Sequence, residues 1–81
     1  MDVLLELNGS QRSILKRDKI KIRLRGRRQV KDLISYIQSS MPNIFPRYAG
    51  YTVFVNNLPA PFEQELKDND KISFIPHLGG G

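Results

Sequence analysis

The sequence ends in three consecutive glycines, Gly79, Gly80 and Gly81, which follow the segment Pro76-His77-Leu78. Glycine loses more backbone entropy on folding than any other residue, so a run of glycines adds nothing to a packed core. Because glycine has no Cβ, an extended Gly-Gly end fits a channel that any side chain would block. Its carboxylate can then be adenylated, converted to a thioester or thiocarboxylate, or joined to an amine. The alternative is a frayed terminus or a piece of linker.

The rest of the chain offers few residues of the types that catalysis or metal binding requires. There is no cysteine, and the single histidine, His77, can build neither a metal site nor a catalytic dyad alone. We therefore predict no metal site and no bound cofactor, and we expect His77 to serve in contacts of the tail. Asp68 and Asp70 precede a strand and are typical turn residues. Without a nucleophile and a base at a useful spacing, the chain is not expected to be an enzyme.

The positive charge of the chain is concentrated in one segment. The net charge is +5 over 81 residues, and residues 12–28 contain nine Lys or Arg residues against one acid, Asp18. Besides Lys19, Lys21 and Arg23, this segment holds a basic patch of Arg12, Lys16, Arg17, Arg25, Arg27 and Arg28. Such a segment attracts nucleic acid or an acidic protein surface. It can equally be a solvated face that protects an edge strand from aggregation.

Alternating apolar and polar residues predict the strands that lead to the tail. The pattern indicates strands over residues 2–7, 19–25, 51–55 and 71–75, with at most a short edge strand near 62–65. Asn8-Gly9 is a strong hairpin signal, and residues 10–18 are expected to form a long loop or to pair around a bulge. Pro59 and Pro61 are expected to keep their segment irregular, after a turn at Asn56-Asn57.

One helix is predicted, at about residues 29–40. Its apolar residues fall on a single stripe formed by Val30, Leu33, Ile34 and Ile37, and Pro42 ends it. The order of elements is strand, strand, helix, strand, weak strand, strand. We therefore expect an α+β fold with a mixed four- to five-stranded sheet and one main helix packed on one face. Residues 1–78 form a single domain in this interpretation, and residues 79–81 form a flexible tail.

The C-terminal part of the chain carries a motif formed by Leu66, Asp68, Asp70, Ile72, Phe74, Ile75, Leu78, Gly80 and Gly81. This motif and the order of elements resemble those of the ubiquitin-like β-grasp sulfur carriers and modifiers. This family includes the ubiquitin-related modifier, the MoaD- and ThiS-like sulfur carriers and the archaeal small modifier proteins. Val30-Lys31-Asp32-Leu33 resembles the family's helix start, and Val53-Phe54-Val55-Asn56 its third strand. Gly79 departs from the histidine that is common in the ubiquitin-related modifier.

The resemblance implies that the chain is the substrate of a partner enzyme. An activating enzyme of the ubiquitin-activating (MoeB/ThiF-like) type would use ATP to adenylate the carboxylate of Gly81, with Gly80, Gly79, Leu78 and His77 in its channel. A sulfurtransferase would then convert the adenylate to a thiocarboxylate, or a lysine of a target protein would capture it. The sequence does not decide between these two routes.

The resemblance also implies a surface for docking of the activating enzyme. In β-grasp proteins the last strand lies between the first and the third, which would bring Leu4, Phe54 and Ile75 side by side. They would lie on the sheet face away from the helix, and Lys21 and Arg23 would flank them.

Two further functions stay open at this point. The chain could be a basic β-grasp module that binds RNA, although aromatic residues do not interleave with its basic segment. It could also be an adaptor whose glycine tail is incidental. No apolar run approaches the roughly 20 residues of a membrane span. We expect a cytoplasmic monomer.

Overall fold

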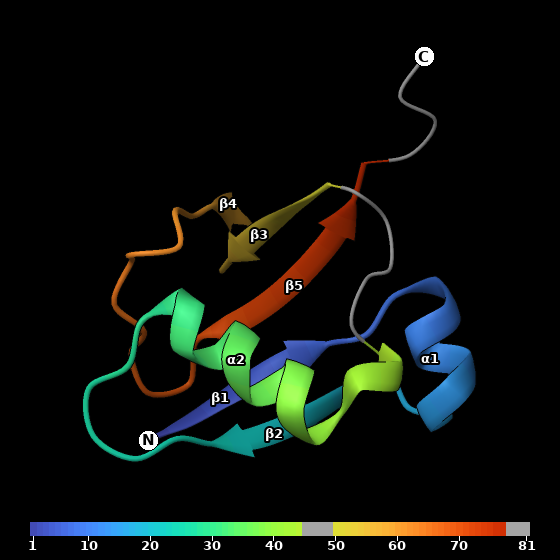
Figure 1. The fold of residues 1–81 in the computed structure, drawn as a ribbon, viewed down its shortest axis with the longest axis horizontal. Helices are drawn as coiled ribbons and strands as arrows, with labels where there is room; N and C mark the ends of the chain where they lie inside the picture. The colour runs from blue at the N-terminus through green and yellow to red at the C-terminus, as the bar shows by residue number, and fades with distance from the viewer. Residues whose placement is uncertain (45–49, 78–81) are drawn as a thin grey trace.

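The computed structural model describes residues 1–44 and 50–77 (Figure 1). The elements are β1 (Asp2–Glu6), α1 (Gly9–Leu15), β2 (Lys19–Arg23), α2 (Val30–Ser40), the 3-10 helix η1 (Pro42–Ile44), β3 (Tyr51–Val55), β4 (Leu58–Pro59) and β5 (Lys71–Pro76). The predicted boundary between the domain and its tail, after residue 78, lies outside the described residues and stays a prediction.

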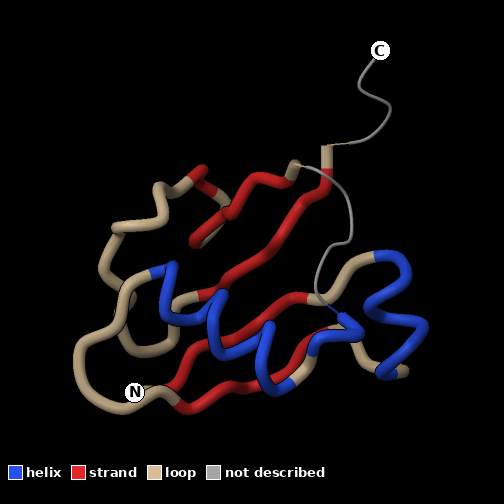
Figure 2. The backbone as a smooth tube through the Cα atoms, in the orientation of Figure 1, coloured by secondary structure: helices blue, strands red, loops and turns tan. Residues whose placement is uncertain are grey.

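The five strands form one mixed sheet in the order β2-β1-β5-β3-β4. β1 pairs with β2 antiparallel and with β5 parallel, while β3 pairs antiparallel with β4 and β5. β5, the last strand in the chain, therefore lies at the centre between β1 and β3 (Figure 1). Helix α2 runs across one face of the sheet (Figure 2). The predicted α+β architecture and β-grasp strand order are confirmed.

The core lies between α2 and the sheet face that it covers. The four predicted helix residues Val30, Leu33, Ile34 and Ile37 are all buried, as are alternate residues of β1, β3 and β5 and Ile22 of β2. α2 begins one residue later than predicted, because the backbone N–H of Gln29 donates to Asp32 Oδ2 at 2.7 Å. This carboxylate satisfies a donor at the helix start and places negative charge at the positive end of the helix dipole.

The prediction of a loop or bulge over residues 10–18 is wrong, because residues 9–15 form helix α1. Asn8 adopts an extended conformation as its N-cap, and its backbone N–H donates to Gln11 Oε1 at 3.0 Å. Asn8-Gly9 therefore begins a helix instead of closing a hairpin. The helix ends at Lys16, whose φ of 56° is left-handed.

The structure also differs from the prediction after the turn at Asn56-Asn57. Both asparagines have positive φ values (52° and 70°), as a two-residue hairpin turn requires, so the predicted turn is confirmed. The following strand, however, is Leu58–Pro59, where an irregular segment was expected. Pro59 is tolerated because β4 is an edge strand, and the next β3 bond comes from Ala60 N–H to Val53 O at 2.9 Å. The short strand expected at 62–65 is reduced to one bridge between Gln29 and Glu65.

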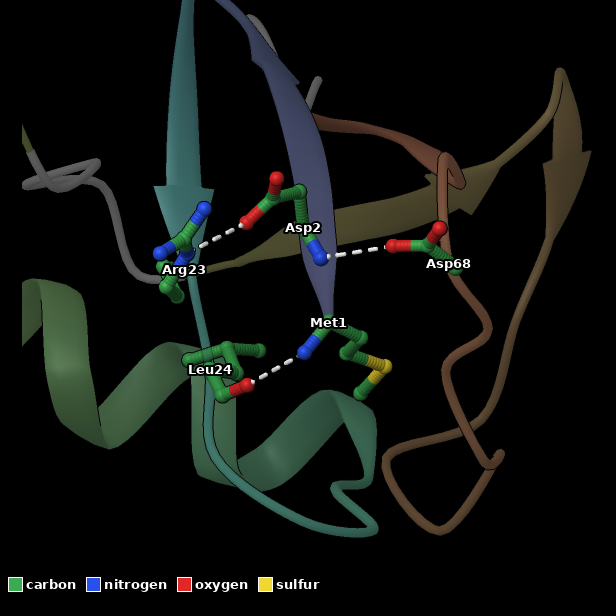
Figure 3. Close-up of polar contacts among 5 residues, drawn as sticks. All are labelled: Met1, Asp2, Arg23, Leu24 and Asp68. Carbon is green, nitrogen blue, oxygen red and sulfur yellow. Dashed lines mark hydrogen bonds and ion pairs between the residues drawn. The ribbon is translucent and has the colours of Figure 1, made fainter.

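The start of the chain is tied to β2 and to the turn before β5 (Figure 3). The Met1 ammonium donates to Leu24 O at 2.8 Å, and the backbone N–H of Asp2 donates to Asp68 Oδ1 at 2.7 Å. Arg23 Nε donates to Asp2 Oδ1 at 3.0 Å. This hydrogen bond, together with the Arg23 charge, lowers the pKa of the Asp2 carboxyl below its usual 3.8.

The buried side chain of Asp70 also stabilises the turn before β5. Its Oδ2 accepts from the backbone N–H of Lys67 at 2.8 Å, and its Oδ1 accepts from Asn56 Nδ2 at 2.9 Å. Asn56 Oδ1 in turn accepts from the backbone N–H of Lys71 at 2.9 Å. Asp68 and Asp70 thus shape the entry into β5, which confirms their interpretation as turn residues.

Candidate functional site

The described part of the candidate site begins at His77, because Leu78, Gly79, Gly80 and Gly81 lie outside the described residues. The backbone N–H of His77 donates to Gly50 O at 3.0 Å. Its ring Nε2 and the Thr52 hydroxyl lie 2.7 Å apart and share a hydrogen bond. The residue from which the tail departs is therefore held by the start of β3, at one end of the central strand.

Gly50 allows this close approach. A Cβ built on Gly50 would lie 2.8 Å from His77 Nδ1, so a larger residue would displace the imidazole. Next to it, the Tyr51 ring packs edge-on against Phe74 with 5.8 Å between the centroids, and burial raises the pKa of the Tyr51 hydroxyl. Sequence reasoning missed Gly50 and Thr52, since their contact with His77 spans more than 20 residues and leaves no local pattern.

The predicted docking residues Leu4, Phe54 and Ile75 all lie on the sheet face opposite α2. Leu4 and Phe54 are half-buried, and Ile75 is 40% exposed. The register, however, does not bring the three together. Leu4 is opposite Lys71, while Ile75, four residues further along β5, is opposite Thr52. Four residues of a strand span about 13 Å.

The expectation that these three residues lie side by side is therefore wrong. The reason is the parallel pairing of β1 with β5, which starts at the first residue of β5. Charged residues occupy the space on this face, including an ion pair between Lys71 Nζ and Glu6 Oε1 at 3.1 Å. Lys21 lies opposite Leu4, far from the tail end, and Arg23 lies opposite Asp2. Ile75 is the apolar member of the set that lies next to His77.

The predicted basic patch is divided into two groups at the two ends of β2. Arg12, Lys16 and Arg17 lie on or directly after α1, whereas Arg25, Arg27 and Arg28 lie between β2 and α2. All six side chains are exposed. Arg12 Nε lies 3.7 Å from Asp18 Oδ1, an exposed pair that contributes little to stability.

Two other functional classes find no support in the described residues. Within residues 1–44 and 50–77, no three His, Asp or Glu side chains gather where they could hold a metal ion. The helices in those same ranges include none that is both long enough and apolar enough to cross a membrane.

Comparisons with known proteins give the chain a family and a set of structural relatives. A family model described as the ThiS family matches residues 5–81. SAMP1 from Haloferax volcanii superposes with a TM-score of 0.77 at 16% identity, with 100% of both chains covered. A protein described as molybdopterin converting factor subunit 1, from Pyrococcus furiosus, gives 0.80 at 22% identity, covering 95% of this chain and 99% of its own.

A third relative comes from a complex of subunits 1 and 2 of the molybdopterin-converting factor from Helicobacter pylori. It gives a TM-score of 0.68 at 22% identity, with 100% of both chains covered. At these identities the structural matches establish the β-grasp fold alone. A search of the curated proteins finds no match.

Proposed function

The chain belongs to the ThiS family, and we propose from this that it works through its C-terminal carboxylate, as a sulfur carrier or as a protein modifier. Members of this family and its structural relatives are small carrier or modifier proteins and not catalysts, in agreement with the missing nucleophile and base. The observation that carries the proposal is the family match itself, which runs through Gly80 and Gly81.

The proposed first step is adenylation of Gly81. A carboxylate oxygen of Gly81 attacks the α-phosphorus of ATP, and pyrophosphate leaves. ATP is thus a substrate of the activating enzyme, and the chain itself binds no cofactor. Hydrosulfide (HS⁻) delivered by a sulfurtransferase then attacks the acyl carbon, the bond to AMP breaks, and a thiocarboxylate and a proton remain. In the other route, the acyl group passes to a lysine amine of a target protein, and the product is an isopeptide bond.

The structure supports a defined exit for the tail. β5 is fixed on both sides, by β1 and β3, and His77 is held by Gly50 and Thr52 directly before the tail. We propose that the activating enzyme docks on the sheet face opposite α2, with Ile75 nearest the tail and Phe54 beyond it. Leu4, Lys21 and Arg23 would lie at the far margin of this contact. The Helicobacter relative is likewise found in a complex with a second subunit.

The adenylation step is tested with the purified chain, ATP and the activating enzyme of the same organism. Pyrophosphate release should depend on the chain. Gly81→Ala should lower the rate by about 100-fold, because a Cβ misplaces the carboxylate at the nucleotide. Gly79→Ala is the matched control and should retain most of the activity, since two glycines then still end the tail. Equal rates for the two variants would contradict the proposal.

The docking face is tested in the same assay. Phe54→Ala should raise the chain's KM by about tenfold, as expected for the loss of one large apolar contact. Leu58→Ala is the control, because Leu58 is 69% exposed but lies on the neighbouring edge strand β4. The melting temperature of each variant shows whether the fold is intact. A KM that Ile75→Ser and Phe54→Ala both leave unchanged would place docking elsewhere.

Mass spectrometry of the chain from its native cells separates the two routes. An oxygen-to-sulfur exchange confined to the C-terminal peptide indicates a carrier, and glycine remnants on lysines of other proteins indicate a modifier. None of the comparisons favours RNA binding. The adaptor alternative requires that deletion of Gly80-Gly81 has no effect in cells. The cytoplasmic location stays a prediction.

A further inference from the structure

The edge of the sheet formed by β2 is separated by β1 from β5, the strand that leads to the tail. β2 is the first strand in the sheet order, and among the described strands it pairs with β1 alone (Figure 1). Met1 and Leu24 donate backbone hydrogen bonds of 2.8 Å to each other. This fixes which residue pairs along β1 and β2 are hydrogen-bonded to each other and which are not. Lys19, Lys21 and Arg23 therefore turn their backbone N–H and C=O groups away from β1, toward the free edge.

An apolar groove of about 420 Å³ adjoins this edge. Its apolar lining comes from α1, β2, α2 and the residue that follows α2, and consists of Leu15, Ile20, Ile22, Tyr36 and Met41. Arg17 and Lys21 also line the groove. Tyr36 is 40% exposed, so the groove presents apolar surface to solvent.

The positive charges along this edge are largely uncompensated. Arg17, Lys19 and Lys21 form no ion pair within residues 1–44 and 50–77, whereas Arg23 is paired with Asp2. The two groups of the basic patch lie beyond the two ends of β2 and extend the same sign of charge in both directions. An apolar groove, a free strand edge and a line of free cations thus coincide.

We propose that the β2 edge and its groove bind an extended segment of a partner protein, in which acidic and apolar side chains alternate. The segment would add to the sheet as a strand beside β2 and pair with the free backbone groups of Lys19, Lys21 and Arg23. Side chains alternate across a strand, so one set covers the groove and the other set meets the lysine ammonium groups. This inference does not depend on the tail or on its activation.

Two other occupants fit the surface less well. A second copy of the chain would bring two β2 edges together and place lysines opposite lysines, which is unfavourable. RNA would use the cations, but single-stranded RNA also needs aromatic side chains on which bases stack. Among the described residues that line the groove, Tyr36 alone is aromatic. The outward N–H and C=O groups of β2 match another polypeptide, because both repeat every two residues.

The test uses a synthetic ten-residue peptide of alternating valine and glutamate, titrated into the full chain and followed by NMR. Amide shifts should concentrate on residues 15–23, Tyr36 and Met41, and amide-proton exchange of Lys21 should slow. A serine–glutamate peptide carries the same charge without the apolar set. It should bind at least about tenfold more weakly, since burial of each valine contributes favourably. Equal binding of both peptides would reduce the interaction to charge attraction and overturn the proposal.

Two variants test whether the positive charge on β2 contributes to peptide binding, one on β2 and one at a distant control position. Lys21→Glu should weaken binding of the valine–glutamate peptide and strengthen binding of a valine–lysine peptide. Lys67→Glu makes the same charge change in the turn before β5 and should do neither. A ten-nucleotide oligouridine that binds the same residues more tightly than the peptide would overturn the proposal in favour of RNA.

The strand pairing is tested on the peptide, which leaves the protein unchanged. N-methylation of one alternate set of peptide amides removes the donors that face β2, whereas methylation of the other set alters amides that face solvent. Binding should be lost with one set and retained with the other. Retention with both sets would exclude pairing along the β2 edge and overturn the proposal.

Discussion

His77 joins the end of β5 to the start of β3 through its backbone and its ring. Gly50→Ala should push the imidazole away from the Thr52 hydroxyl, because the new Cβ would lie 2.8 Å from Nδ1. We expect changed ring resonances of His77 in NMR spectra and a loss of stability of about 0.5–1.5 kcal/mol, the usual contribution of one hydrogen bond.

Thr52→Val is the matched variant for this contact. It removes the hydroxyl partner while leaving Gly50 in place, so it should release the ring without a steric clash. Unchanged ring resonances in both variants would show that His77 is held by its backbone alone. The same pair of variants in the adenylation assay tells whether a fixed tail origin matters to the activating enzyme.

At the scale of elements, the turn before β5 depends on the buried carboxylate of Asp70. Asp70→Ala should lower the free energy of unfolding by about 2–3 kcal/mol, because it strands the donors of Lys67 and Asn56. Asp68→Ala removes one exposed contact with Asp2 and should cost less than about 1 kcal/mol. Urea unfolding measures both. Similar losses of stability for the two variants would mean that the buried carboxylate of Asp70 contributes no more to this turn than the exposed one of Asp68.

The elements that were predicted correctly are those with a clear period. Alternation identified β1, β2, β3 and β5, and the stripe from Val30 to Ile37 identified α2. α1 was missed because Asn8-Gly9 is compatible with a hairpin turn and with a helix start. The spacing of Asn8 and Gln11, which form a capping contact, was the available signal. Without α1, the groove beside β2 could not be foreseen.

At the scale of the molecule, the register between distant strands limited how well the candidate site could be predicted from the sequence. The face on which Leu4, Phe54 and Ile75 lie follows from alternation within each strand. Their separation follows from the register of β1 against β5, two strands that are more than 60 residues apart in the chain. No local pattern encodes that register, so the three docking residues were predicted to lie closer together than they do.

The whole fold should also respond to acid through Asp2, which links β1 to β2 and to the turn before β5. Its pKa is lowered from 3.8 in the folded state, first of all by the hydrogen bond from Arg23. The unfolded state therefore binds more protons as the pH falls. The contribution of Asp2 to stability is present above its unfolded pKa and is lost as the pH falls through the folded pKa.

Asp2→Asn removes this titration. The difference in melting temperature between the natural chain and the variant should therefore stay constant above about pH 5 and shrink as the pH falls through 3.8 toward the lower folded pKa. Because the pair is exposed, added salt should reduce the difference as well. A difference that stays constant over this range would assign the role of Asp2 to its backbone contacts.

The central position of β5 has a consequence for how the protein is made. During translation, the β1–β2 pair and the β3–β4 hairpin leave the ribosome first, and the strand that unites them comes last. A chain that is released before β5 lacks the strand that joins these two fragments, and such incompletely folded chains are substrates for proteases. The complete sheet can therefore form only after β5, the strand that leads directly into the tail, has been translated.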